Sequence, residues 1–191
     1  MVDPSLVVKQ LGKKLGPLEG REHELVCADC SALGCDPNTI DTVIFHAPCP
    51  DGFAAAFAAW LKLGDRATYI GIEHGPGKEA KAGDLTGKRV AVLDFSFDAK
   101  TTAEHLAAAA SYVVLDHHAS AQEALETLPR ANKIFDMKMS GATLAWAYFH
   151  AGAPPPTLLR YIEDKDIWRW AMRSSKEFSA AFPLVAKVPP P

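Results

Sequence analysis

The stretch Tyr112-Val-Val-Leu-Asp-His-His118 decides the fold, because a run of apolar residues ends abruptly in an acid and two histidines. A short apolar run between helical patterns is typical of a buried strand in a parallel sheet. Residues 42–45 and 89–93 form two similar runs, which end at His46 and Asp94. Further strands are predicted at 67–72 and 132–137. The alternation of strands with helical patterns predicts an α/β layered domain, with a mainly parallel sheet flanked by helices.

The polar residues that follow these strands predict a binding site. In parallel sheets ligands collect at the carboxyl ends of the strands, so side chains from three strand ends should meet in one crevice. A single Asp after a strand is as often a helix cap, and a single His as often a core residue. Several such positions in one register favour a metal site instead. The candidates are His46, Cys49, Asp51, Asp94, Asp116, His117 and His118.

Imidazole and carboxylate together suit manganese, iron, zinc or magnesium. A carboxylate can also bridge two ions about 3.5–4 Å apart, and such a pair polarises a phosphoryl oxygen. A helix predicted over 53–63 begins just after Asp51-Gly52, where its backbone N–H groups favour an anion. The residues therefore predict a divalent-metal site at which a phosphate can bind.

Helix starts are predicted at three further places. Thr101 and Ser120 each stand three residues before a Glu, which is the spacing of a capping box, and Ser140 opens another helical pattern. A last helix, over 158–170, carries the mixed-charge run Glu163-Asp164-Lys-Asp166. Such a run is usually a solvated face, although one of its three acids can turn inward as a ligand.

Composition limits the classes of partner. The chain has 191 residues, 48% of them apolar, which suits one domain with a real core. A net charge of −3 argues against a surface that grips long duplex nucleic acid, so a polyanionic substrate needs local cations. The sequence has no signal segment, membrane span or secreted disulfide pattern, which favours a cytoplasmic location.

Three segments are expected along the chain: a flexible N-terminal extension over 1–40, the domain over 41–184 and a Pro-rich tail over 185–191. The extension contains four potential zinc ligands, but their spacing is wrong for a zinc ribbon or finger, and free thiols are expected. His74 falls in a Gly-rich loop and is expected to be exposed. The four residues are His23, Cys27, Cys30 and Cys35.

Over residues 42–182 the sequence resembles the DHH phosphoesterase family, which is named after the motif seen here at Asp116-His117-His118. His46 to Gly52 resembles its first motif, Asp94 its second and Asp164 its last, with Ser140 to Leu144 similar to the helix start between them. The resemblance implies a manganese-dependent enzyme that hydrolyses phosphodiesters or phosphoanhydrides. Implied substrates are short oligonucleotides, single-stranded ends, cyclic dinucleotides, polyphosphate or pyrophosphate.

The resemblance also implies two metal sites that share Asp94 as a bridge. Asp164 is chosen over Asp166 because it stands four residues before Trp168, as in some family members. His118 would face the substrate, and Asp116 would orient the histidine pair. By position, one site would comprise His46, Cys49 and Asp94, and the other Asp51, Asp94, His117 and Asp164.

The sequence departs from the family pattern in two respects. Cys49 stands where the family usually has an Asp, which shifts the expectation at that site from manganese towards zinc or iron. No C-terminal substrate-binding domain follows, so the chain is interpreted as a short form or a fragment. The alternative function is a catalytically weak protein that binds a nucleotide or phosphate, and a purely structural module is the third interpretation.

Overall fold

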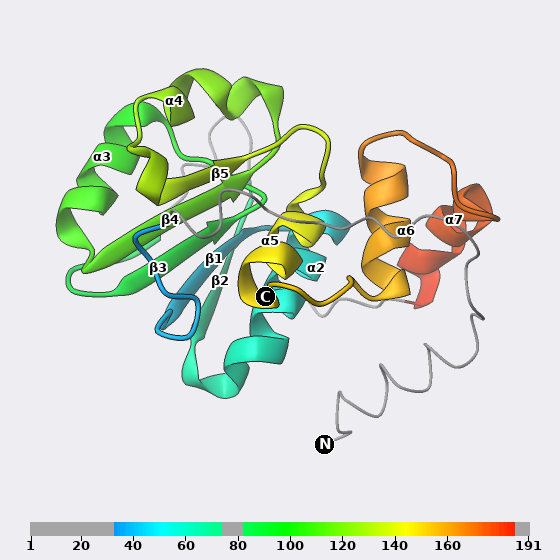
Figure 1. The fold of residues 1–191 in the computed structure, drawn as a ribbon, viewed down its shortest axis with the longest axis horizontal. Helices are drawn as coiled ribbons and strands as arrows, with labels where there is room; N and C mark the ends of the chain where they lie inside the picture. The colour runs from blue at the N-terminus through cyan, green and yellow to red at the C-terminus, as the bar shows by residue number, and fades with distance from the viewer. Residues whose placement is uncertain (1–32, 74–81, 186–191) are drawn as a thin grey trace.

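The structure is a computed structural model that describes residues 33–73 and 82–185. Within these ranges five strands form one sheet in the order β2-β1-β3-β4-β5, and every pairing is parallel (Figure 1). The predicted α/β fold is confirmed. The strands are β1 (Thr42–His46), β2 (Thr68–Ile72), β3 (Arg89–Leu93), β4 (Ser111–Asp116) and β5 (Lys133–Phe135).

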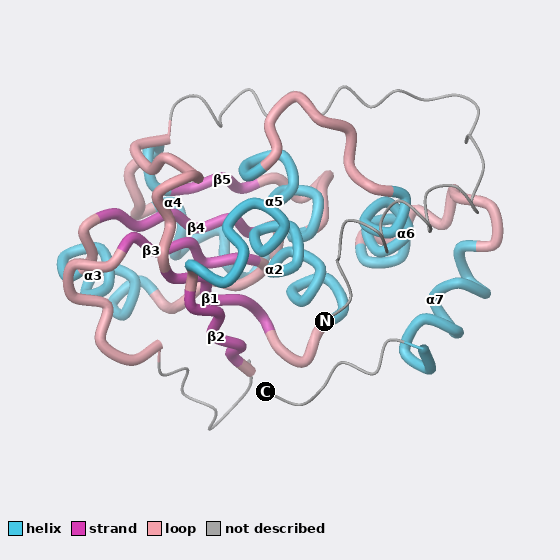
Figure 2. Tube along the Cα trace, turned by 90° about the horizontal axis from the view of Figure 1, so that it is seen from below, coloured by secondary structure: helices cyan, strands magenta, loops and turns pink. Residues whose placement is uncertain are grey.

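Helices cover both faces of the sheet. α3 and α4 lie on one face and α2 and α5 on the other, with α6 and α7 beyond them (Figures 1 and 2). The helices are α2 (Pro50–Leu63), α3 (Ala99–Ala108), α4 (Gln122–Glu126), α5 (Gly141–Phe149), α6 (Thr157–Asp166) and α7 (Ser175–Val185). Short 3-10 turns occupy Gly64–Arg66, Ala119–Ala121 and Arg130–Asn132.

The central strands are apolar throughout because both of their faces are covered. On β3, Ala91 and Leu93 belong to the core beneath α2 and α5. Their neighbours Val90 and Val92 belong to the second core, beneath α3 and α4. All four side chains are fully buried. The two cores fix the sheet between its helices and thereby fix the positions of the strand ends.

The face of α2 that packs inward consists of alanines and not of the aromatic residues that share its helical spacing. Ala55, Ala58 and Ala59 are completely buried, whereas Phe53 is exposed. Small side chains allow two helices to approach closely, and here they seat α2 against α5. The helix also begins at Pro50, earlier than predicted, because proline suits the first helical position.

Of the three further helix starts, the one at Ser140 is confirmed and two capping predictions are wrong. Ser140 and Thr143 cap the first turn of α5 reciprocally. α3 begins earlier than predicted, because Asp98 is a strong N-cap whose carboxylate accepts the Thr101 N–H at 2.9 Å. Ser120 lies in the 3-10 turn Ala119–Ala121, two residues before α4 begins at Gln122.

The N-terminal extension is shorter than predicted. Cys35 and Ile40 are buried in the core, and the Tyr148 hydroxyl donates to the Cys35 carbonyl at 2.9 Å. Residues 33–40 therefore belong to the domain because their apolar side chains fill its core. The remaining extension with His23, Cys27 and Cys30, the loop residue His74 and the end of the Pro-rich tail lie outside the described residues.

The C-terminal helix α7 was not predicted, and it extends to Val185, the first residue of the segment that was expected to be a Pro-rich tail. Phe178 and Phe182, one helical turn apart, have ring centroids 5.4 Å from each other. Phe178 also packs on Tyr161 of α6, with 4.7 Å between the centroids. Among the helices formed by residues 33–73 and 82–185, none combines the length and apolar character needed to cross a membrane.

Candidate active site

The strand register brings three of the predicted site residues to one level. Phe45 pairs with Leu93 and Leu93 pairs with Leu115, so the residues that follow, His46, Asp94 and Asp116, end adjacent strands side by side. The site lies at the boundary between β1 and β3, where the strand order reverses direction. In doubly wound sheets this switch point is where ligands bind.

Two glycines allow the helices to approach these strand ends. A Cβ on Gly141 would lie 2.5 Å from Oδ1 of Asp94, and a Cβ on Gly52 would lie 2.2 Å from the His46 carbonyl oxygen. No side chain fits at such distances. Glycine at both positions is therefore what allows α2 and α5 to begin directly against the site.

Asp51 is held by the N-terminus of α5. Its Oδ2 accepts the Gly141 N–H at 2.6 Å and its Oδ1 accepts the Ala142 N–H at 3.0 Å. These are N–H groups that have no partner within the helix itself. Burial raises the pKa of Asp51 well above its usual value, and the neighbouring carboxylates of Asp94 and Asp166 raise it further. The position thus combines a fixed carboxylate with an excess of negative charge.

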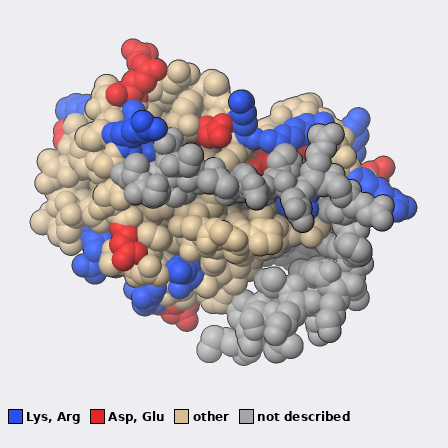
Figure 3. All heavy atoms as spheres, in the orientation of Figure 1, with Lys and Arg blue, Asp and Glu red and all other residues tan. Residues whose placement is uncertain are grey.

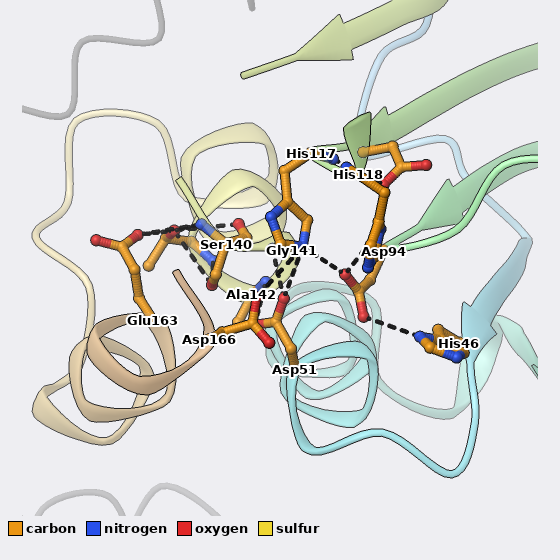
Figure 4. A network of polar contacts seen from close by, with 12 residues as sticks. His46, Asp51, Asp94, His117, His118, Ser140, Gly141, Ala142, Glu163 and Asp166 are labelled. Atoms are coloured by element: carbon orange, nitrogen blue, oxygen red, sulfur yellow. Dashed lines mark hydrogen bonds and ion pairs between the residues drawn. The ribbon is translucent and has the colours of Figure 1, made fainter. Parts of the chain in front are cut away.

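His117 stands at the centre of three carboxylates. Its Nε2 lies 3.1 Å from Oδ1 of Asp94, 3.5 Å from Oδ2 of Asp51 and 3.4 Å from Oδ2 of Asp166. Asp51, His117 and Asp166 each direct a ligand atom to one place, from α2, the end of β4 and the end of α6 (Figure 4). Three carboxylates around one imidazole are a suitable donor set for a divalent ion.

Asp94 faces a second group of potential ligands with its other oxygen. Its Oδ2 lies 3.5 Å from Nδ1 of His46, and Figure 4 shows the carboxylate between His46 and His117. His46, Cys49 and Asp94 form the second such group. The carboxylate therefore lies between the two groups of potential ligands, and its bridging role stays a prediction.

The backbone and the charge of Asp94 are both perturbed. Its φ of 57° is left-handed, which is uncommon outside glycine, and such conformations cluster at functional sites. Burial alone would raise the pKa of Asp94, but hydrogen bonds from His117 and His46 outweigh it and lower the pKa to about 2. Two hydrogen bonds, the one to Asp94 with the larger effect and the one to Cys49 with the smaller, raise the pKa of His46 to about 10. Asp94 is thus held as a carboxylate.

His118 and Asp116 form a separate pair at the edge of the site. Nδ1 of His118 donates to Oδ1 of Asp116 at 2.7 Å, and the same oxygen accepts the backbone N–H groups of His117 and His118. Ser96 donates to the other oxygen. Asp116 is buried, whereas 42% of the His118 side chain is exposed. Asp116 therefore holds a histidine that solvent can reach, and its role in the reaction stays a prediction.

An open cavity adjoins this exposed histidine. It has a volume of about 270 Å³ and extends from the site over the loops that follow β3 and β4. Its lining includes His46, Asp94, Asp116 and His118, together with Ser96 and Ser120. A ligand can thus reach both Asp94 and His118 from solvent.

The choice of Asp164 as a ligand is wrong, because the structure brings Asp166 to the site instead. The oxygens of Asp164 accept the N–H groups of Ala171 at 2.9 Å and Met172 at 3.1 Å, so they hold the chain after α6. A signal for Asp166 was present in the sequence. Leu159 and Ile162 are buried on α6, and Asp166 continues their helical spacing onto the same face.

A second network beside the site was not predicted. Glu163 is buried and pairs with Arg169 at 2.6 Å, while its other oxygen accepts from the Thr143 hydroxyl. Arg169 also donates to the Lys138 carbonyl. Glu163 thus joins α6 to the first turn of α5, which carries the N–H groups that hold Asp51. Mixed charge in the sequence indicated a solvated face and concealed this pair.

Comparisons with known proteins add little beyond the fold. No protein-family model matches the chain. It is 32% identical over 155 residues to uncharacterized protein R106 of Acanthamoeba polyphaga mimivirus, covering 75% of this chain and 37% of that protein. The chain thus spans little more than a third of that relative. A crystal structure of an uncharacterized protein from Helicobacter pylori G27 matches with a TM-score of 0.51 and 15% identity, over 68% of this chain and 44% of that one, and supports the α/β fold alone.

Proposed function

We propose that the protein is a divalent-metal-dependent phosphoesterase that hydrolyses a phosphodiester or phosphoanhydride bond. The observation that carries this proposal is the position of Asp94, whose two oxygens face two separate groups of potential ligands. The half-exposed His118 stands beside them, with its Nδ1 4.0 Å from Oδ1 of Asp94. The resemblance to the DHH phosphoesterases supports the same conclusion, since residues of its first and second motifs and of its Asp-His-His motif lie together here.

The residues fit a pair of metal ions. The buried Oδ2 of Asp94 faces Nδ1 of His46 at 3.5 Å, and three carboxylates converge on His117. A buried excess of negative charge is costly unless a cation balances it. When bound, a metal pair would polarise the phosphoryl group and lower the pKa of a water molecule. The residues that would hold it are His46, Cys49 and Asp94 on one side, and His117 with the Asp51, Asp94 and Asp166 carboxylates around it on the other.

Manganese is the expected metal, with zinc or iron favoured at the Cys49 side because a thiolate is a softer ligand than a carboxylate. Cys49 is partly exposed and its sulfur belongs to the group with His46 and Asp94. The same cysteine supports the alternative function, a catalytically weak protein that binds a nucleotide or phosphate. In that case only the carboxylates around His117 would hold an ion.

His118 is the residue that we assign to proton transfer. Its hydrogen bond to Asp116 raises the pKa of the imidazole and fixes the Nδ1 proton, so Nε2 is the atom that can release a proton. A leaving oxygen that reaches the exposed ring can take this proton. Asp116 acts through His118 and is therefore a positioning residue.

The proposed substrates are a phosphorylated small molecule or a short single-stranded nucleic acid, and the net charge of −3 argues against long duplexes. A cytoplasmic location remains our proposal.

Hydrolysis of an aryl phosphodiester with added Mn²⁺ tests the proposal. We expect turnover by the native protein, none in excess chelator and none in Asp94→Asn. The matched control is Asp84→Asn. It makes the same chemical change at an exposed residue away from the site, where the carboxylate accepts the Thr86 N–H. Full turnover in chelator, or an Asp94→Asn variant as active as Asp84→Asn, would contradict the proposal. Metal binding without any turnover would favour the alternative.

A further inference from the structure

The turn that follows α6 presents an aromatic pair to solvent. Trp168 is 78% exposed, more than any other large hydrophobic residue of the described chain. Its ring meets that of Trp170 edge to face, with 5.7 Å between the centroids and an interplanar angle of 86°. Trp170 thus supports one edge of the Trp168 ring while the ring remains open to solvent.

Hydrogen bonds from Asp164 hold the backbone of this turn in an unfavourable conformation. Trp168 and Trp170 have φ values of 56° and 52°, a left-handed conformation that bulky residues rarely adopt. The Asp164 carbonyl accepts the Arg169 and Trp170 N–H groups, and its carboxylate accepts the next two, from Ala171 and Met172. Strained residues that the surroundings fix in this way concentrate at functional sites. The exposure of Trp168 is therefore built into the fold.

The turn adjoins the candidate active site. Asp166, whose Oδ2 lies 3.4 Å from Nε2 of His117, precedes Trp168 by two residues. Two residues span at most about 7 Å, so the Trp168 backbone lies within that distance of the Asp166 backbone. Arg169, between the two tryptophans, pairs with Glu163 at 2.6 Å, and Glu163 accepts from Thr143 in the first turn of α5. One polar network therefore joins the turn to the helix that holds Asp51.

A basic side chain lies against the aromatic pair although the chain carries a net charge of −3. Nζ of Lys176 lies 5.9 Å from the centroid of the Trp170 ring, a cation–π contact. Figure 3 shows Lys and Arg gathered over α6 and the loop that follows it. An open aromatic face among cations, next to a phosphoester site, is suited to a base that carries phosphate.

We propose that Trp168 is the stacking surface for a nucleobase of the substrate, with Trp170 as its support and the phosphate directed towards Asp94 and His117. The proposal rests on the phosphoesterase function proposed above and narrows its substrates to nucleotides or short single strands, as opposed to polyphosphate or pyrophosphate. A protein partner that docks on Trp168 is the competing explanation.

Binding of AMP and of ribose 5-phosphate to the intact protein tests this proposal by calorimetry in the presence of Mn²⁺. The two probes share sugar and phosphate, so their difference reports the base alone. We expect AMP to bind more tightly than ribose 5-phosphate. Trp168→Ala should weaken AMP binding roughly 5- to 160-fold, the range measured when a stacking aromatic is truncated, and leave ribose 5-phosphate unchanged. Trp168→Phe should retain most of the affinity.

Trp60→Ala is the matched control. Trp60 lies nine residues from Asp51 along α2, a distance of about 14 Å, and donates to Asp65. AMP should quench tryptophan fluorescence in the native protein and in Trp60→Ala, but not in Trp168→Ala. Two results would overturn the proposal: equal affinity of the native protein for AMP and ribose 5-phosphate, or unchanged AMP binding in Trp168→Ala. The second result is the one expected if Trp168 instead docks a protein partner. Because these binding measurements need no turnover, they test base stacking separately from hydrolysis. Base-selective binding without turnover would support stacking alone, and turnover without base selectivity would support the phosphoesterase function alone.

Discussion

Replacing Gly141 by alanine should damage the site without removing any of its functional groups. The new Cβ would lie 2.5 Å from both Oδ1 and Cβ of Asp94. Carbon atoms pack best at about 3.5–4.0 Å, so α5 or the Asp94 side chain must move by about 1 Å. Overpacking of this kind costs about 1–3 kcal/mol of unfolding free energy. Alanine's better helix propensity offsets at most about 1 kcal/mol of that cost.

The same shift should disturb the metal ligands more than the fold. The Gly141 N–H donates to Asp51 at 2.6 Å, so moving the start of α5 displaces two carboxylates at once. A misplacement of about 1 Å can cost on the order of 10²-fold in rate. We expect Gly141→Ala to lower Mn²⁺ affinity at least tenfold, measured by calorimetry, and to lower the urea midpoint.

Gly34→Ala is the control for this substitution. A Cβ at Gly34 would meet its nearest atom, Cβ of Ala131, at 3.7 Å, which is an ordinary contact. Its stability should therefore change by less than about 1 kcal/mol, and metal binding should not change. Native Mn²⁺ affinity and turnover in Gly141→Ala would refute the reasoning that this glycine sets the approach of α5 to Asp94.

Five further substitutions separate the roles of neighbouring residues. Asp166→Asn should weaken metal binding with little loss of stability. Asp164→Ala should keep its metal but lose about 3–6 kcal/mol in urea denaturation, because each of its two hydrogen bonds to a charged carboxylate is worth about 1.5–3 kcal/mol. Metal should protect Cys49 from alkylation, and Cys49→Asp should raise Mn²⁺ affinity; alkylation rates indifferent to metal would place the thiol outside the site. His118→Ala should lower turnover by about 10²–10⁴-fold and keep both metal ions, whereas His117→Ala should lose one of the two ions. Equal metal loss in the two variants would contradict the separate roles assigned to the two histidines.

The fold and most of the site could be predicted because both depend on the order of elements along the chain. Apolar runs that end at His46, Asp94 and Asp116 define strands, and parallel strands place their carboxyl ends on one edge. The glycine at 141 was visible only as part of a helix start. Its function depends on the distance between α5 and Asp94, which is a property of the packed structure.

The errors arose where the geometry at a helix end decides the outcome. Asp164 and Asp166 are two residues apart, and only the termination of α6 at Asp166 turns the first towards Ala171 and the second towards His117. Spacing to a tryptophan cannot show this, because Trp168 lies beyond the helix, in a left-handed conformation. Ser96, which donates to Asp116, was missed because a lone serine in a loop has no distinguishing pattern.

The most direct test of the account is the Mn²⁺ stoichiometry of the intact protein and of Asp94→Asn, with Asp84→Asn as control. Asparagine tolerates the left-handed backbone at position 94, so the variant should fold and differ chiefly in charge. We expect a pair of ions per chain in the native protein and in Asp84→Asn, and weakened binding of both ions in Asp94→Asn. Binding by Asp94→Asn with native stoichiometry and affinity would show that Asp94 bridges nothing and would contradict the proposed metal centre.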